Sequence, residues 1–203
     1  MAASESPTPT TRRRRADAER SVARIMDAAV DALASDPEVT MAEVARQAGV
    51  VRATIYVHFP TRESLIEAVT HRAIAEATVA IEAAEPERGD PGAALRRVVA
   101  TAWRTLGRYH PLVAINTQLP QSELRHRHAA ALSALEPLIA RGQREGAFRA
   151  EVPAAWHLSM LLALVHAASA ETEAGRLQAD QVEPALVATV LGAVSSGTGV
   201  PTA

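Results

Sequence analysis

Two short predicted helices around a glycine, within residues 40–60, limit the possible folds of this chain more than any other feature. Thr40-Met41-Ala42-Glu43 has the spacing of a capping box, in which a Thr and a Glu three residues later satisfy the first N–H groups of a helix. Gly49 follows after little more than two turns and can take the left-handed conformation that turns the chain. A second helix resumes near Val51, places Val51, Ile55 and Phe59 on one side at i, i+4 and i+8, and is stopped by Pro60. The stretch therefore predicts a helix, a tight turn and a helix.

The segment before this unit predicts an amphipathic helix that begins near Ala16 and ends at Asp36-Pro37. Its apolar residues recur at steps of three and four and form one stripe. They are Val22, Ile25, Met26, Ala29, Val30 and Leu33. Three helices of this kind form a small core, and the third can then present its outer side to the DNA major groove. The pattern predicts a helix-turn-helix reader of DNA.

Residues 40–65 resemble the signature of the TetR family of transcriptional repressors. The matching stretches are Thr40-Met41-Ala42-Glu43-Val44-Ala45, Ala48-Gly49-Val50, Thr54-Ile55-Tyr56-Val57-His58-Phe59 and Arg62-Glu63-Ser64-Leu65. The combination is specific because the helix start, turn, helix end and next helix start all occur in order. One departure is Val51, which stands where the family frequently has Ser, so a side-chain cap and a phosphate contact are missing there.

The resemblance implies that Thr40 meets a DNA phosphate at a helix N-terminus, although a helix cap alone also explains this residue. Arg52 is the candidate for base contact, because a guanidinium at the head of the third helix can bind guanine O6 and N7 together. Ala53 is small enough to let that helix approach the groove closely. Thr54 is expected to touch a base or a phosphate.

Three further residues match phosphate-contacting positions of the family: Tyr56, His58 and Arg62. His58 is equally well explained as an ordinary polar residue at a helix end. The run Arg12 to Arg15 in the N-terminal segment can enter the minor groove as a basic arm, or can remain a solvated tail with nonspecific attraction to DNA.

The remaining sequence predicts an all-α protein with about nine helices. Its 48% hydrophobic but only 3% aromatic composition favours close-packed helices over sheets. A long helix is expected from Thr61 to Ala84, followed by helices near residues 92–107, 112–119, 122–145, 153–174 and 180–195, with a kink at Pro137. The predicted divisions are a flexible basic arm at 1–15, the helix-turn-helix domain at 16–62, a ligand-binding and dimerisation domain at 63–196, and a flexible tail at 197–203.

Several classes of function are excluded by residues that are missing. The chain has no Cys, which removes disulfides, thiolate metal sites and Cys nucleophiles. It also lacks a His-Glu-x-x-His pair, a Ser elbow, a P-loop and a Glu-x-x-His pattern, so we expect neither an enzyme nor a metal or other cofactor. No apolar run is long enough for a membrane span and no signal peptide is evident, which predicts a cytoplasmic protein without a membrane partner.

Readers of this type bind palindromic operators in double-stranded DNA as homodimers, with half-sites about 34–36 Å apart. Apolar stripes on the last two predicted helices are the candidate interface, as a four-helix bundle formed by two chains. The interface residues proposed from these stripes are Trp156, Met160, Leu164, Ala168, Leu186 and Val190. The alternative is that both stripes only complete the core of one chain.

The middle helices are expected to enclose a site for a small molecule. The candidate ligand-binding residues are Trp103, Tyr109, Leu112, Asn116, Leu119, Arg125 and His166, each of which plain core packing also explains. Arg125-His126-Arg127-His128 is predicted to be a solvated surface run, with an anion site as the alternative. The predicted function is a repressor released by a small, largely apolar effector; the alternative is a DNA-binding dimer without an effector, constitutive or controlled by a protein partner.

Overall fold

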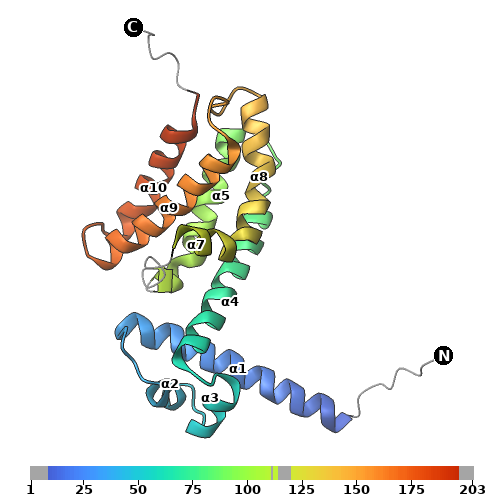
Figure 1. The fold of residues 1–203 in the computed structure, drawn as a ribbon, viewed down its shortest axis with the longest axis vertical. Helices are drawn as coiled ribbons and strands as arrows, with labels where there is room; N and C mark the ends of the chain where they lie inside the picture. The colour runs from blue at the N-terminus through green and yellow to red at the C-terminus, as the bar shows by residue number, and fades with distance from the viewer. Residues whose placement is uncertain (1–8, 111, 114–119, 197–203) are drawn as a thin grey trace, which may run out of the picture. The chain divides into compact units, whose positions relative to one another are not determined.

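The computed structural model describes residues 9–110, 112–113 and 120–196, and this part of the chain is helical with no β-strand (Figure 1). It divides into two compact units, Met1–Val69 and Thr70–Ala203. The division falls inside helix α4 (Arg62–Ala83) rather than after residue 62, because Leu65 and Val69 on its first turns are buried in the first unit. None of the described helices is both long and apolar enough to cross a membrane.

Helix α1 (Pro9–Ser35) begins earlier than the predicted start at Ala16, so the second half of the expected flexible arm is helical. Pro is favoured at the first helical position and Arg is a good helix former, which explains the extension through residues 12–15. Residues 1–8 of the predicted arm and the tail at 197–203 lie outside the described residues. The helix ends where Asp36-Pro37 predicted, and its buried face includes Ile25, Ala29 and Leu33.

Helices α2 (Met41–Gln47) and α3 (Arg52–His58) form the predicted helix-turn-helix on α1. Gly49 joins them with φ +65°, a left-handed conformation that glycine adopts without steric cost. The Val50 N–H reaches back to the Ala45 carbonyl at 3.0 Å and closes the end of α2. Ile55 on α3 is fully buried and Phe59 nearly so, which fixes the inward side of α3. The spacing therefore predicted Ile55 and Phe59 correctly but Val51 wrongly, because Val51 precedes the helix in an extended conformation and is 70% exposed.

The second unit contains α5 (Pro91–Leu106), the 3₁₀ turn η1 (Gly107–Tyr109), α7 (Gln121–Arg127), α8 (Ala129–Arg144), α9 (Ala154–Glu173) and α10 (Ala179–Val194). α5 packs against α8 and α10, and α9 also packs against α8 and α10 (Figure 1). Asp90 caps α5 by accepting from the Ala93 N–H at 2.8 Å, with Pro91 in the first turn. These helices together enclose one apolar core.

The single helix predicted at 122–145 is two helices, with the break at His128. The His128 ring contacts the ring of His166, with the two centroids 5.4 Å apart, and local spacing does not reveal this tertiary contact. Pro137, the expected kink, lies within α8, which continues on both sides of it. Of the helix predicted at 112–119, all but residues 112–113 lies outside the described residues.

Candidate nucleic-acid interface and apolar cavity

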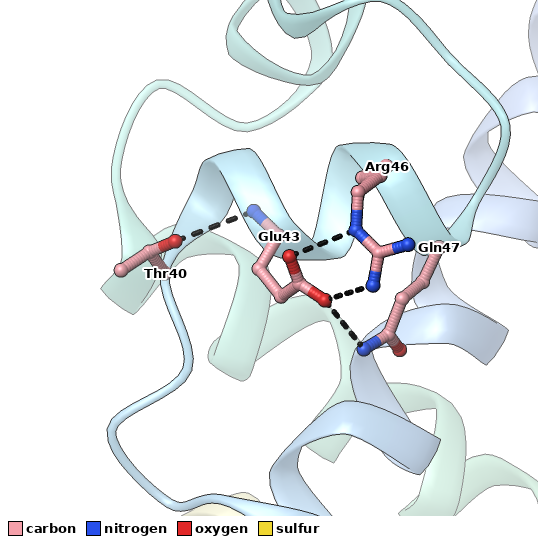
Figure 2. A network of polar contacts seen from close by, with 4 residues as sticks. All are labelled: Thr40, Glu43, Arg46 and Gln47. Carbon is pink, nitrogen blue, oxygen red and sulfur yellow. Dashed lines mark hydrogen bonds and ion pairs between the residues drawn. The ribbon is translucent and has the colours of Figure 1, made fainter.

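Thr40 starts α2 in the predicted way, because its Oγ1 accepts a hydrogen bond from the Glu43 N–H at 3.3 Å (Figure 2). The other half of the capping box is different. The Glu43 carboxylate turns to Arg46, which donates from Nε at 3.0 Å, and to Gln47, which donates at 3.3 Å. These two bonds lower the pKa of Glu43 to about 2, so the carboxylate is ionised at neutral pH. Arg46 thus binds the Glu43 carboxylate, which in a complete capping box would accept from the backbone N–H of Thr40.

The outward side of α3 carries the predicted base-reading residues. Arg52 and Ala53 are exposed, and the Arg52 guanidinium lies 5.6 Å from the centre of the exposed Tyr56 ring. Thr54 and His58 are partly exposed. The structure therefore groups five of the predicted contact residues on one short helix. Their contact with DNA stays a prediction.

Two apolar side chains on the same segment were not predicted as contacts. Val57 is 78% exposed and Val51 is 70% exposed, and Val51 makes no side-chain cap to α3, as expected for the residue that replaces Ser. An apolar side chain exposed on a helix in the major groove can contact a thymine methyl group. For Val57 the signal in the sequence was its position outside the predicted apolar stripe, whereas Val51 belonged to that stripe and its exposure could not be read from spacing.

Arg62 has an internal role that the sequence did not reveal. Its guanidinium donates to the carbonyl oxygens of Pro37 and, at 3.4 Å, Val39. These bonds tie the start of α4 to the loop that precedes α2, within the first unit. A guanidinium has five N–H donors, so these bonds leave donors that a DNA phosphate could accept from. The phosphate contact stays a prediction.

An apolar cavity of about 100 Å³ lies within the second unit. Its walls come from α4, α5, η1, the start of α8 and α9, together with residues 112–113. The lining residues are Thr70, Ala73, Ile74, Ala77, Ile81, Val98, Val99, Ala102, Leu106, Tyr109, Leu112, Val113, His128, Ala131, Leu132, Leu135, Leu161, Leu162, Val165 and His166. Most of these were missed, because helical spacing shows that a residue faces inward but not whether it faces core or cavity.

Of the predicted ligand-binding residues, Tyr109, Leu112 and His166 line this cavity. Trp103 is buried outside the lining and stacks on His110 with ring centroids 4.0 Å apart. Arg125 also lies outside the lining, since its guanidinium donates to the hydroxyl of Ser159 on α9. Asn116 and Leu119 lie outside the described residues.

His128 corrects the interpretation of residues 125–128 as a solvated run. It is half-buried and lines the cavity, and its Nδ1 donates to the Leu124 carbonyl at 2.9 Å. Burial lowers the pKa of this imidazole. Residues 131, 132 and 135, which follow it at helical spacing, also line the cavity. The apolar pattern of α8 was thus the signal that His128 faces inward.

Three of the predicted dimer residues belong to the core of the single chain. Ala168, Leu186 and Val190 are buried against the other helices of the second unit, and Val190 is 0% exposed. α10 packs on both α5 and α9, which covers its apolar stripe. These three residues therefore complete the core of the single chain, and their predicted contact with a second chain stays a prediction.

The other three predicted dimer residues face outward on α9. Trp156 is 63% exposed, and Met160 and Leu164 are partly exposed. Sequence reasoning missed a set of small exposed residues beside them, because alanine carries little hydrophobic signal. These are Ala163 and Ala167 on α9 and Ala185, Ala188 and Gly192 on α10. The described structure contains one chain, so the interface stays a prediction.

Comparison with known proteins finds a family match for the helix-turn-helix. The family model described as "Bacterial regulatory proteins, tetR family" matches residues 25–69, which cover the last eleven residues of α1, all of α2 and α3, and the start of α4. A curated protein, the HTH-type transcriptional repressor LfrR of Mycolicibacterium smegmatis, is 40% identical over 81 residues, or 40% of this chain and 43% of that protein. The HTH-type transcriptional regulator NfxB of Pseudomonas aeruginosa is 28% identical over 149 residues, which cover 70% of this chain and 78% of that protein.

The likeness extends to the larger unit in solved structures. The structure of LfrR from Mycobacterium smegmatis in complex with proflavine superposes with a TM-score of 0.65 and 26% identity, over 91% of this chain and 98% of that one. The fatty acid degradation regulator FadR of Bacillus halodurans shares the fold, with a TM-score of 0.71 at 18% identity over 93% of this chain and 97% of that one. The alignment with the curated LfrR sequence spans less than half of that protein, whereas the structural match spans nearly all of it. Residues 25–69 thus match the TetR family of bacterial regulatory proteins, and the chain has the fold of a TetR-like transcriptional regulator.

Proposed function

We propose that the chain is a dimeric transcriptional repressor that binds a palindromic operator and leaves it when a small, largely apolar molecule enters the cavity. The observation that carries the proposal is the outward side of α3. It presents a cation, a small residue and an aromatic ring on a helix whose other side is fixed in a core. A B-DNA major groove admits one helix, and Arg is the commonest reader of guanine there.

Dimerisation is supported by the exposed faces of α9 and α10. Residues 154–170 and 184–196 contain no Asp, Glu, Lys or Arg, although many of their side chains face outward. A charge-free surface with Trp156 and Met160 at one end and small residues such as Ala188 is typical of helices that pack against a second copy. We propose this face, instead of the buried residues Leu186 and Val190, as the dimer interface.

Control by a ligand is supported by the cavity and by its walls. Five lining residues, from Thr70 to Ile81, belong to α4, whose first turns belong to the DNA-binding unit. The cavity of about 100 Å³ is smaller than most ligand sites, so a larger molecule must displace part of its walls. A ligand that favours the displaced arrangement of α4 would lower operator affinity. The cavity favours this function over constitutive DNA binding, for which a solid core would suffice.

The DNA-binding part is tested by selecting bound fragments from random duplex DNA and measuring affinity for the selected operator. We expect Arg52→Ala to weaken binding by about 1–3 kcal/mol and to relax the preference at one base pair. Arg88→Ala is the matched control, because it removes an exposed Arg in the second unit that pairs only with the nearby Glu85 among its described ion pairs. An unchanged affinity and preference in Arg52→Ala would show that α3 does not read bases through this residue.

The dimer interface is tested by placing a charge on the apolar face. We expect Ala188→Arg to raise the fraction of monomer in analytical ultracentrifugation and to weaken operator binding, because an unpaired charge would be buried between the chains. Ala75→Arg is the control, since Ala75 is an exposed alanine on a different helix, α4. A dimer that persists equally in both variants would place the interface elsewhere.

A further inference from the structure

We propose that the molecule that fits the cavity is uncharged and mostly apolar, and carries one hydroxyl or N–H group that donates a hydrogen bond to the imidazole of His166. This inference rests on the proposed use of the cavity as the effector site, and it assigns the chemical class of the effector. It follows from the hydrogen bonds and the charge of the cavity lining.

His166 lies on α9, lines the cavity and is 6% exposed. One of its ring nitrogens is hydrogen-bonded to the backbone carbonyl of Val113, and its Nδ1 is buried without a partner. A carbonyl oxygen can only accept, so the bonded nitrogen is Nε2 and it carries the proton. In the neutral ring Nδ1 then has a free lone pair. The side chain therefore offers an acceptor, and the missing partner is a donor.

His128 repeats this pattern at the same end of the cavity. Its Nδ1 donates to the Leu124 carbonyl at 2.9 Å, so in the neutral ring Nε2 is the acceptor. The rings of His128 and His166 meet edge to face, with centroids 5.4 Å apart and planes at 79°. Two imidazoles that have each given their N–H to a backbone carbonyl cannot satisfy each other. A donor supplied by the ligand would relieve the cost of the unpaired nitrogen.

The charge of the lining excludes ions. The described lining residues include no Asp, Glu, Lys or Arg, so neither an anion nor a cation would find a counter-charge. Burial lowers the pKa of both histidines, that of His166 to about 4, and they are neutral at pH 7. Arg72 and Arg108 lie over the ring of Tyr109 and are not part of the lining. At the end of the cavity formed by His128 and His166, a carboxylate would therefore face lone pairs in place of donors.

The size of the cavity sets the first probe. Its volume of about 100 Å³ is somewhat below the roughly 150 Å³ of an apolar cavity known to take benzene, so a single ring fits after a small relaxation of the walls. Para-cresol offers such a ring with one donor. Toluene lacks the donor, 4-methylanisole keeps only the acceptor, and 4-methylbenzoate and 4-methylbenzylammonium carry opposite charges.

Binding of these five probes is measured by calorimetry on the full chain at pH 7 without DNA. We expect para-cresol to bind about tenfold more tightly than toluene or 4-methylanisole, which corresponds to one buried hydrogen bond. The two ions should bind more weakly than any neutral probe. In His166→Leu the preference for para-cresol should fall to about twofold or less while toluene still binds. The control His126→Leu, at an exposed position of α7, should keep the preference.

The proposal is overturned if para-cresol and 4-methylanisole bind equally to the parent protein, a comparison that needs no variant. It is also overturned if an ion binds as tightly as para-cresol, if none of the neutral probes binds, or if folded His166→Leu keeps the preference. Operator release is measured separately. Selective cresol binding without release would refute ligand-controlled repression alone, whereas release by a charged molecule would refute this inference and leave repression intact.

Discussion

Acid should destabilise this protein through the buried imidazole of His166. Burial is the main reason that its pKa falls from 6.5 to about 4, with a smaller contribution from His128. The folded state therefore binds the proton more weakly than the unfolded state does. The stability that this group contributes is fully present above pH 6.5 and is lost as the pH falls from 6.5 towards 4.

The size of the effect follows from the two pKa values. A pH of 5 lies 1.5 units below the ordinary pKa of 6.5, so the imidazole of the unfolded chain is largely protonated. The folded ring, with a pKa of about 4, is largely neutral at this pH. Linkage then gives a loss of about 2 kcal/mol between pH 7 and pH 5 from this one group. His110 and His128, whose pKa values are also lowered by burial, add to the loss in the same direction.

The contribution of His166 is isolated by comparing variants. Urea unfolding at pH 7 and pH 5, at one fixed protein concentration, gives the free energy of unfolding of the parent and of His166→Leu. We expect the parent to lose about 2 kcal/mol more than the variant over this interval. His71→Gln, which removes an exposed histidine on α4, should lose as much as the parent. Equal losses in the parent and His166→Leu would refute the reasoning, because His166 would then titrate alike in both states.

Two further predictions concern the fold. A Cβ at Gly142 would lie 2.1 Å from the Phe148 ring, so Gly142→Ala should lower the free energy of unfolding by about 1–3 kcal/mol, as overpacking does. Gly107→Ala is the control, because open space surrounds Gly107 and its stability should not fall. Equal thermal unfolding of the two variants would contradict the contact between residue 142 and Phe148. Thr40→Ala should lower the free energy of unfolding in urea by about 1 kcal/mol, because the Glu43 N–H loses its acceptor. Thr40→Ser should keep most of this stability, and an Ala variant as stable as the Ser variant would exclude a capping role.

The DNA-binding unit could be predicted almost completely from the sequence, because local chemistry specifies it. Thr40 caps a helix, Gly49 supplies the left-handed turn, and Pro60 ends α3, all within a short stretch of chain. Ile55 and Phe59 are buried at the positions that helical spacing predicted, whereas Val51 of the same stripe is exposed. Each of these signals acts through neighbours in the chain, so it can be recognised without the tertiary structure. The start of α1 was placed too late because seven helical residues before Ala16 carry no apolar stripe.

The helices of the larger unit could be predicted from the sequence, but which of their faces are buried, exposed or line the cavity could not. An apolar stripe shows that a helix buries one side, and only packing decided that Val190 lies in the core while Ala188 is exposed. Likewise, His128 and His166 are far apart in the chain, and their contact at the cavity depends on how α8 meets α9. The sequence by itself determined the helix-turn-helix through local hydrogen bonds and turn chemistry; the cavity and the outward faces of α9 and α10 arise from contacts between distant residues, which only the tertiary structure decided.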